Sequence, residues 1–223
     1  MSQITKNFQK LKAEIPDNVK IVLAAKCRTP EEIKEVIAAG ATDLGENYVQ
    51  EAEDMFNALG DAAKNIRWHM IGSLQKNKIN KALPMFDVVQ TVDSIKIAED
   101  LGVRAGRLNK KISVFIEINI GNEFNKAGLK PDYDLVYGLA LAISKQEFLE
   151  LTGIMTMGPY SGDPEAIRPY FKQAKTIFDQ LKDAGLENTK MEYLSMGMSH
   201  SYKVAVEEGS NMIRPGTVVF GGR

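Results

Sequence analysis

Lys26 occupies a position in this sequence where a lysine can do chemistry. The five residues before it, Ile21 to Ala25, are apolar and predict a buried strand. A helix start follows, because Thr29 can cap a helix and Pro30 suits its first position. Proteins of the α/β class keep their chemistry where a parallel strand ends and its crossover begins. An amine there can attack a carbonyl group, although a lysine that only reaches from a strand end to water shows the same pattern.

Two loops near the end of the sequence contain residues of the types that suit an anion site. Gly197 and Ser199 follow one predicted strand, and Gly216 and Thr217 follow the next. Glycine lets the backbone approach a ligand, and Ser199 stands where it can cap the helix predicted over 199–208. Each glycine alone is more often a simple turn residue. Two such loops after neighbouring strands are typical of a phosphate site.

The elements that must position these residues alternate regularly along the chain. Each strand pattern is followed by a helix or a helix start, and no Pro- or Ser-rich linker interrupts the series. The predicted strands are 21–25, 42–45, 66–71, 86–90, 112–119, 149–156, 190–194 and 211–214. The predicted helices are 2–14, 30–39, 47–59, 75–82, 94–106, 131–145, 164–184 and 199–208.

Eight strands in this order predict an α/β fold, a (β/α)8 TIM barrel with an extra N-terminal helix, in a single domain of residues 1–223. Ile4, Phe8 and Leu11 give the first helix one apolar face, which we expect to cover one end of the core. The loops after the seventh and eighth strands are the usual phosphate site of this barrel. Ser199 and Thr217 fall in these two loops.

The composition excludes several classes of function. The net charge is −1 with acids and bases mixed along the chain, so we expect neither a nucleic-acid nor a membrane partner. Cys27 is the one cysteine, which rules out an internal disulfide and suits a reducing compartment. No apolar run approaches the length of a membrane span and the N-terminus lacks a hydrophobic signal core, so we expect a cytoplasmic protein. We also expect the protein to be a monomer.

Other catalytic arrangements find little support in the sequence. His69 and His200 are the only histidines and no cysteine pair exists, which argues against a metal site. No nucleophile-elbow motif supports Ser-His-acid catalysis. We expect His69 to pack inside the barrel near the site rather than to act as an acid–base catalyst.

A carbonyl-seeking lysine and a phosphate site in one barrel mouth suggest pyridoxal 5′-phosphate (PLP), whose aldehyde and phosphate lie at opposite ends of a flat ring. Several motifs along the whole sequence also resemble the pyridoxal-phosphate homeostasis proteins, single-domain relatives of the N-terminal barrel of bacterial alanine racemase. These motifs are Leu44-Gly-Glu-Asn47-Tyr48-Val-Gln-Glu51, Trp68-His69-Met-Ile-Gly72-Ser-Leu-Gln75-Lys-Asn-Lys78, Leu194-Ser-Met-Gly-Met-Ser199 and Glu207-Glu-Gly209-Ser-Asn-Met-Ile-Arg214-Pro-Gly216-Thr217-Val-Val-Phe-Gly221.

The resemblance implies roles for particular residues. It implies that Lys26 is the Schiff-base residue, that Arg214 faces the pyridine nitrogen and that Asn47 lies near the ring. The phosphate is then held by Ser199, Gly216 and Thr217, and Lys126 lies near the mouth of the barrel.

The sequence departs from the family pattern at three places. Ala25-Lys26-Cys27 stands where relatives commonly have Ser-Lys-Thr, so Cys27 could add a thiol beside the lysine. Ser73 stands where a histidine is usual, and His200 stands near a frequent acid. These changes affect the surroundings of the ring and leave the lysine and the phosphate loops intact.

Three functions remain open at this point. The chain could hold PLP and deliver it to apo-enzymes, it could be a PLP-dependent amino-acid racemase, or it could be a Schiff-base aldolase that binds a sugar phosphate. We favour the carrier, with no catalytic residues assigned, because the sequence ends soon after its eighth strand. The resembled racemases use a tyrosine from a second domain, although Tyr48 could serve as an internal substitute.

Overall fold

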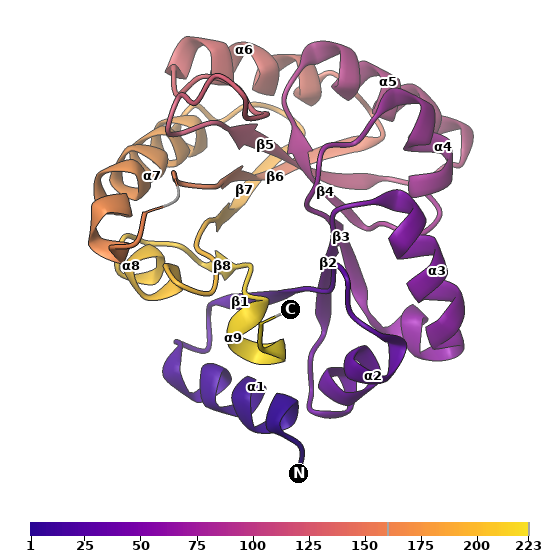
Figure 1. The fold of residues 1–223 in the computed structure, drawn as a ribbon. Helices are drawn as coiled ribbons and strands as arrows, with labels where there is room; N and C mark the ends of the chain where they lie inside the picture. Colours follow the sequence, from indigo (N-terminus) through magenta and orange to yellow (C-terminus); the bar gives the residue numbers. More distant parts are fainter. Residues whose placement is uncertain (160, 223) are drawn as a thin grey trace.

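The computed structural model describes residues 1–159 and 161–222, and within them eight parallel strands close into a barrel (Figure 1). Each strand pairs with the next one in the chain, and the last pairs with the first. The predicted (β/α)8 TIM barrel is confirmed. The strands are β1 (Lys20–Ala24), β2 (Asp43–Glu46), β3 (Arg67–Met70), β4 (Val88–Val92), β5 (Ile112–Ile118), β6 (Leu149–Thr156), β7 (Thr189–Ser195) and β8 (Met212–Ile213).

Helices surround the barrel, and their bounds differ from the predicted ones mainly at the ends. The α-helices are α1 (Gln3–Glu14), α2 (Pro30–Ala38), α3 (Val49–Leu59), α4 (Ile79–Ala82), α5 (Ile95–Arg107), α6 (Tyr133–Ser144), α7 (Arg168–Asp183), α8 (Tyr202–Glu207) and α9 (Thr217–Phe220). The 3₁₀ helices are η1 (Gly60–Asn65), η2 (Lys76–Lys78) and η3 (Pro164–Ile167).

The helix start after Lys26 forms as the sequence predicts. The Thr29 hydroxyl accepts a hydrogen bond from the Glu32 N–H (3.3 Å), and the Glu32 carboxylate accepts one from the Thr29 N–H (2.8 Å). This capping box fixes the first turn of α2. Between β1 and the cap, Cys27 adopts a φ of +58°, in the left-handed region that L-residues seldom occupy. The tight turn places Lys26 between the end of β1 and the start of α2.

Helix α1 lies outside the barrel wall beside α2 and α9, as Figure 1 shows. The Thr5 hydroxyl donates to Glu35 of α2 (3.1 Å), and the Asn7 side chain donates to the Val219 carbonyl of α9 (3.0 Å). Phe8 is buried beneath these contacts. The predicted apolar face is confirmed, because Phe8 and Leu11 are buried in the core. Polar contacts on both flanks of its apolar face fix it as one member of the outer ring.

Side chains on each strand point alternately into the barrel and toward the helices. One apolar cluster fills part of the barrel interior, and a larger cluster lies between the strands and the surrounding helices. The interior cluster consists of Val22, Val88, Phe115, Met155 and Met212. Because these residues point inward, the residues two places further along the same strands point inward as well, nearer the carboxyl end of the barrel.

The barrel closes through a very short strand. β8 has two residues, and both pair with β1, through Lys20 to Met212 and Ile21 to Ile213. On its other side β8 pairs with β7 at one position, Ser195 to Met212. The loops that carry the candidate phosphate site follow directly from this seam.

Candidate functional site

A cavity of about 730 Å³ opens where the strands end, and all six site residues predicted from the sequence line it. These residues come from three regions far apart in the chain. They are Lys26, Asn47, Ser199, Arg214, Gly216 and Thr217. Cavities that hold small molecules measure about 300–1,000 Å³, so this volume suits a small organic ligand.

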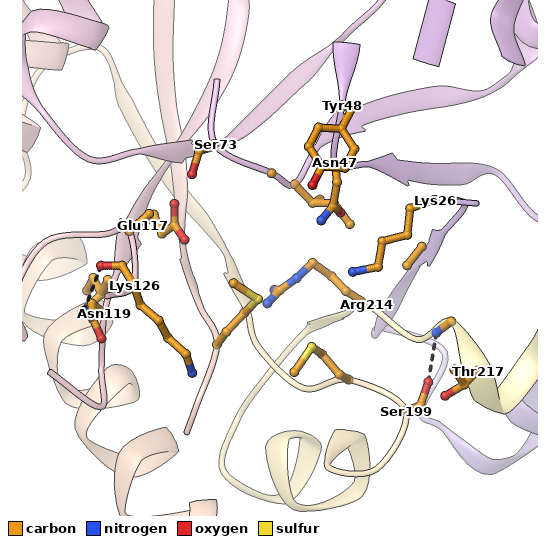
Figure 2. Close-up of a pocket in the computed structure, with 18 of the residues that line it drawn as sticks. Lys26, Asn47, Tyr48, Ser73, Glu117, Asn119, Lys126, Ser199, Arg214 and Thr217 are labelled. Atoms are coloured by element: carbon orange, nitrogen blue, oxygen red, sulfur yellow. Dashed lines mark hydrogen bonds between the residues drawn. The ribbon is translucent and has the colours of Figure 1, made fainter. Parts of the chain in front are cut away.

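Lys26 reaches the cavity because of the alternation along β1. Val22 points into the barrel, and Ala24 and Lys26, at every second position after it, both line the cavity. Figure 2 shows the Lys26 side chain directed toward Arg214 in the middle of the site. The amine is therefore presented to a ligand from the wall formed by β1.

The loops after β7 and β8 meet at Ser199. The Ser199 Oγ accepts hydrogen bonds from the N–H groups of Gly216 (3.0 Å) and Val218 (3.2 Å), and one of them is drawn as a dashed line in Figure 2. These bonds join the start of α9 to the β7 loop. The prediction that Ser199 caps the helix after β7 is wrong. That helix, α8, begins later, after Ser201, and Ser199 serves the start of α9 instead. Its hydroxyl proton remains available to an acceptor in the cavity.

Asn47 is positioned by a close contact between two loops. A Cβ atom added to Gly72 would lie 2.3 Å from the Asn47 carbonyl oxygen, far inside van der Waals contact. Only glycine permits this approach, and it holds the Asn47 backbone against the loop after β3. Asn47 lines the cavity next to Tyr48, a residue that is 63% exposed.

Arg214 lines the cavity although only 4% of its surface is exposed. Its Nη1 donates to the Ser195 hydroxyl (2.6 Å), and its Nη2 donates to the Thr156 carbonyl (2.8 Å). Burial lowers the pKa of Arg214 to about 10, while the Glu117 carboxylate acts in the opposite direction. The guanidinium therefore remains positively charged at neutral pH.

Glu117 also lines the cavity, and the sequence reasoning missed it. Burial raises its pKa to about 7; the charge of Asp93 adds to the rise and that of Arg214 opposes it. Its Oε2 has no hydrogen-bond partner among the described residues. The signal was present in the sequence, because Glu117 stands two places after the inward-pointing Phe115 in the longest β-rich run.

A second carboxyl group is buried beside the site. Glu46, at the end of β2, is 1% exposed, and burial raises its pKa to about 8, with the nearby Glu51 adding to the rise. Its Oε2 also lacks a hydrogen-bond partner within the described chain. Lys26 lies close enough for its charge to oppose that rise.

The wall opposite Lys26 is formed by the loop after β5, as Figure 2 shows. The Asn119 side chain braces this loop by donating to the Glu123 carbonyl (2.8 Å) and accepting from the Glu123 N–H (3.0 Å). The Lys126 amine pairs with the Glu123 carboxylate at 2.6 Å. Lys126 thus lies at the cavity, as the family resemblance implies.

The remaining candidates lie at different depths. Ser73 and His200 line the cavity. Cys27 is exposed and lies outside the cavity lining. His69 is completely buried in the barrel interior, where it bonds to Asp43 and does not reach the cavity.

Two general features complete the description of the site and chain. Among the residues the structure describes, no three His, Cys, Asp or Glu side chains gather in a way that could hold a metal ion. None of the helices within 1–159 and 161–222 is both long and apolar enough to span a bilayer.

Known proteins match this chain over nearly its full length. Residues 1–223 match the family described as "Alanine racemase, N-terminal domain". The chain is 36% identical to the pyridoxal phosphate homeostasis protein of Aquifex aeolicus over 205 residues, 92% of this chain and 87% of that protein. It is also similar to the structure of PipY of Synechococcus elongatus with PLP bound, at 30% identity and a TM-score of 0.88, covering 98% of this chain and all of that one.

A more distant likeness concerns the fold alone. The alanine racemase of Clostridium difficile superposes with a TM-score of 0.85 at 17% identity, and the match covers 99% of this chain but 57% of that one. The family match spans the chain, and a relative above 30% identity covers most of it. The chain therefore belongs to the alanine racemase N-terminal domain family, among its pyridoxal phosphate homeostasis proteins.

Proposed function

We propose that this chain binds PLP through a Schiff base on Lys26 and holds it for delivery to the apo forms of PLP-dependent enzymes, without appreciable catalysis. The observation that carries the proposal is the set of groups around one cavity: an amine, a hydroxyl-rich turn and a buried guanidinium. These groups fit the aldehyde, the phosphate and the ring nitrogen of PLP. PipY, a relative at 30% identity, was solved with PLP bound, which supports the proposal.

The turn of Ser199, Gly216 and Thr217 fits a phosphate dianion by its donors. The Ser199 and Thr217 hydroxyls both line the cavity, and each can donate one proton. Thr217 lies between the two residues whose N–H groups donate to Ser199. Its own N–H donates to no acceptor within the described part of the protein. Charge-assisted hydrogen bonds of this kind contribute roughly 1.5–3 kcal/mol each.

Arg214 fits the ring nitrogen in one protonation state. A guanidinium has only donors and keeps its charge, so a nitrogen that it contacts must act as the acceptor. Bound PLP supplies an electron sink for carbanion chemistry, and the sink is weaker when the ring nitrogen carries no proton. Arg214 therefore favours a holding role over efficient chemistry.

The second candidate function is amino-acid racemisation. The shared barrel of alanine racemase favours it, and Tyr48 offers a hydroxyl at the cavity rim. Moving a proton from one face of a substrate to the other requires a positioned acid–base group on each face. Tyr48 is mostly exposed, so the packing around it leaves its side chain poorly fixed. The naming of the similar proteins for PLP homeostasis supports the carrier.

One experiment tests the proposed function directly. The purified chain is loaded with PLP, its visible absorbance is recorded, and an excess of an apo-enzyme is added. We expect a visible band that borohydride removes, and recovery of the apo-enzyme's activity as the band disappears. A chain that acquires no band contradicts PLP binding. A band that stays unchanged while the apo-enzyme remains inactive contradicts delivery.

A further inference from the structure

A continuous chain of side-chain hydrogen bonds crosses the barrel interior behind the cavity and ends at Arg214. Asp43 Oδ1 bonds to His69 Nε2 at 2.9 Å, and His69 Nδ1 bonds to Gln90 Nε2 at 2.9 Å. The Ser195 hydroxyl donates to Gln90 Oε1 at 2.7 Å, and Arg214 Nη1 donates to Ser195 Oγ at 2.6 Å. Each of these five residues is at most 4% exposed.

The donors in this chain all point the same way. Arg214 can only donate, so the Ser195 oxygen accepts and its one proton is left for Gln90 Oε1. The Gln90 amide nitrogen then donates to His69 Nδ1. His69 therefore carries its proton on Nε2 and donates it to the Asp43 carboxylate. This series of hydrogen bonds begins at a buried cation, Arg214, and ends at a buried anion, Asp43.

The charges at the two ends agree with this assignment. Burial lowers the pKa of His69 despite its bond to Asp43, so the imidazole is neutral. Burial acts to raise the pKa of Asp43, but hydrogen bonds from His69 and Thr42 outweigh it and the pKa is lowered. Asp43 is thus an anion, and its charge polarises the hydrogen bonds that lead to Arg214.

Two of the Arg214 nitrogens are fixed from behind the cavity. Nη1 is held by Ser195 and Nη2 by the Thr156 carbonyl, and the residue lines the cavity in this orientation. Gln90 and His69 lie outside the cavity lining, so a ligand there does not touch them. Their hydrogen-bonded route to a ligand runs through Ser195 and Arg214.

We propose that Asp43, His69, Gln90 and Ser195 are positioning residues that aim Arg214 at the ring nitrogen of the bound cofactor. This inference rests on the proposed function, because it takes the ligand to be a pyridine. It assigns a task to polar side chains in a barrel interior that they share with the apolar cluster. A merely structural role, in which the side chains only satisfy one another, predicts the same loss of affinity for every ligand of the cavity.

The test compares two ligands that differ at one atom: PLP and its 1-deaza analogue, in which a C–H group replaces the ring nitrogen. The ratio of their dissociation constants reports the contact of the nitrogen with Arg214. In the wild-type chain we expect PLP to bind about 10- to 100-fold more tightly, the value of a charge-assisted hydrogen bond. Ser195→Ala and the nearly isosteric Gln90→Met should each bring this ratio to within about threefold of unity, which is what loss of that contact leaves.

Ser210→Ala is the matched control. Ser210 is also buried, in the segment between β7 and β8. Its hydroxyl donates to backbone carbonyls and takes no part in the series of hydrogen bonds from Arg214 to Asp43. We expect this variant to lower thermal stability while keeping the wild-type ratio. A second readout is the ¹⁵N chemical shift of labelled PLP, which should report an unprotonated, hydrogen-bonded nitrogen in the wild type and a changed environment in Ser195→Ala and Gln90→Met.

The outcomes separate this inference from the proposed function. A wild-type chain that binds neither ligand contradicts both. In another outcome, the wild-type chain binds PLP while Ser195→Ala and Gln90→Met weaken the binding of both ligands equally. That outcome supports the proposed function and contradicts the positioning role. Variants that keep both the wild-type ratio and the wild-type ¹⁵N shift overturn it as well.

Discussion

Ser199 and Gly216 lie 17 residues apart in the sequence, and a direct hydrogen bond of 3.0 Å joins the Ser199 oxygen to the Gly216 N–H. This bond links the loops after β7 and β8 and brings the Ser199 and Thr217 hydroxyls to the same cavity. It makes Ser199 a structural residue as well as a candidate ligand contact. Its removal must therefore affect both the chain without ligand and the binding of an anion.

Replacement of Ser199 and Thr217 tests the phosphate site. Ser199→Ala leaves two N–H groups without their acceptor, which should lower the free energy of unfolding of the ligand-free chain by about 1–3 kcal/mol. Combined with Thr217→Val, it should weaken PLP by about 10-fold or more relative to unphosphorylated pyridoxal. Titration of both ligands, followed by absorbance, measures the difference. Ser201→Ala, which removes a similar hydroxyl outside the cavity lining, is the control. Equal losses for the two ligands place the phosphate elsewhere.

Lys26→Ala tests the covalent attachment of the cofactor. The variant should lose the visible band completely and keep the far-UV circular dichroism of the wild type, because the side chain points into a cavity. Lys126→Ala removes the lysine on the opposite wall and should keep the band. Mass spectrometry after borohydride reduction locates the modified residue. An adduct that persists in Lys26→Ala contradicts the assignment.

The two buried glutamates make the stability of the ligand-free chain depend on pH. Their pKa values are raised in the folded state, to about 7 for Glu117 and about 8 for Glu46, so the folded chain binds more protons than the unfolded one. Their stabilising effect is complete below their ordinary pKa of 4.5 and is lost as the pH rises through 7 and 8. We expect the free energy of unfolding to fall between about pH 4.5 and pH 8, on the order of 1.4 kcal/mol for each unit of pKa shift.

Urea unfolding at several pH values measures this dependence. Glu117→Gln should reduce the slope of the curve between about pH 4.5 and pH 7, and Glu46→Gln should reduce it between about pH 4.5 and pH 8. Glu147→Gln, a change at an exposed position, is the control and should leave the curve unchanged. A Glu117→Gln curve that coincides with the wild-type curve contradicts the raised pKa of that carboxyl.

Hydrogen exchange at the substrate Cα decides between carrier and racemase. We expect the PLP-loaded chain to incorporate negligible solvent deuterium into L-alanine or other amino acids, and to produce no D-isomer. Arg214 cannot protonate the ring nitrogen, and the exposed Tyr48 is poorly fixed as a second acid–base group. Mass spectrometry and chiral chromatography measure both. Exchange at rates typical of enzymes, on the order of one per second or faster, establishes the racemase instead.

The residues that were predicted correctly are those whose environment is set by nearby sequence. Thr29 forms its capping box with Glu32, three residues away, and Lys26 is carried into the cavity by the alternation of β1. The role of Ser199 was mistaken because its partners are the N–H groups of a loop that only the closed barrel brings near. The bond from Gln90 to His69 joins neighbouring strands of different chain segments, and neither residue shows in sequence which polar group it will face.

The two-residue strand β8 gives the barrel a weak point with a thermodynamic consequence. Lys26 follows β1, whereas Arg214 and Gly216 follow β8, so a ligand that contacts all three spans the seam between the first and last strands. Such a ligand holds the first and last strands together, and its binding free energy adds to that of the few backbone hydrogen bonds between them. At a ligand concentration of about 100 times Kd this linkage adds about 2.7 kcal/mol against opening. In the ligand-free protein, we expect the backbone amides of β8 to exchange faster than those of the other strands. When the ligand is bound, they should exchange at the same rate as the rest of the barrel.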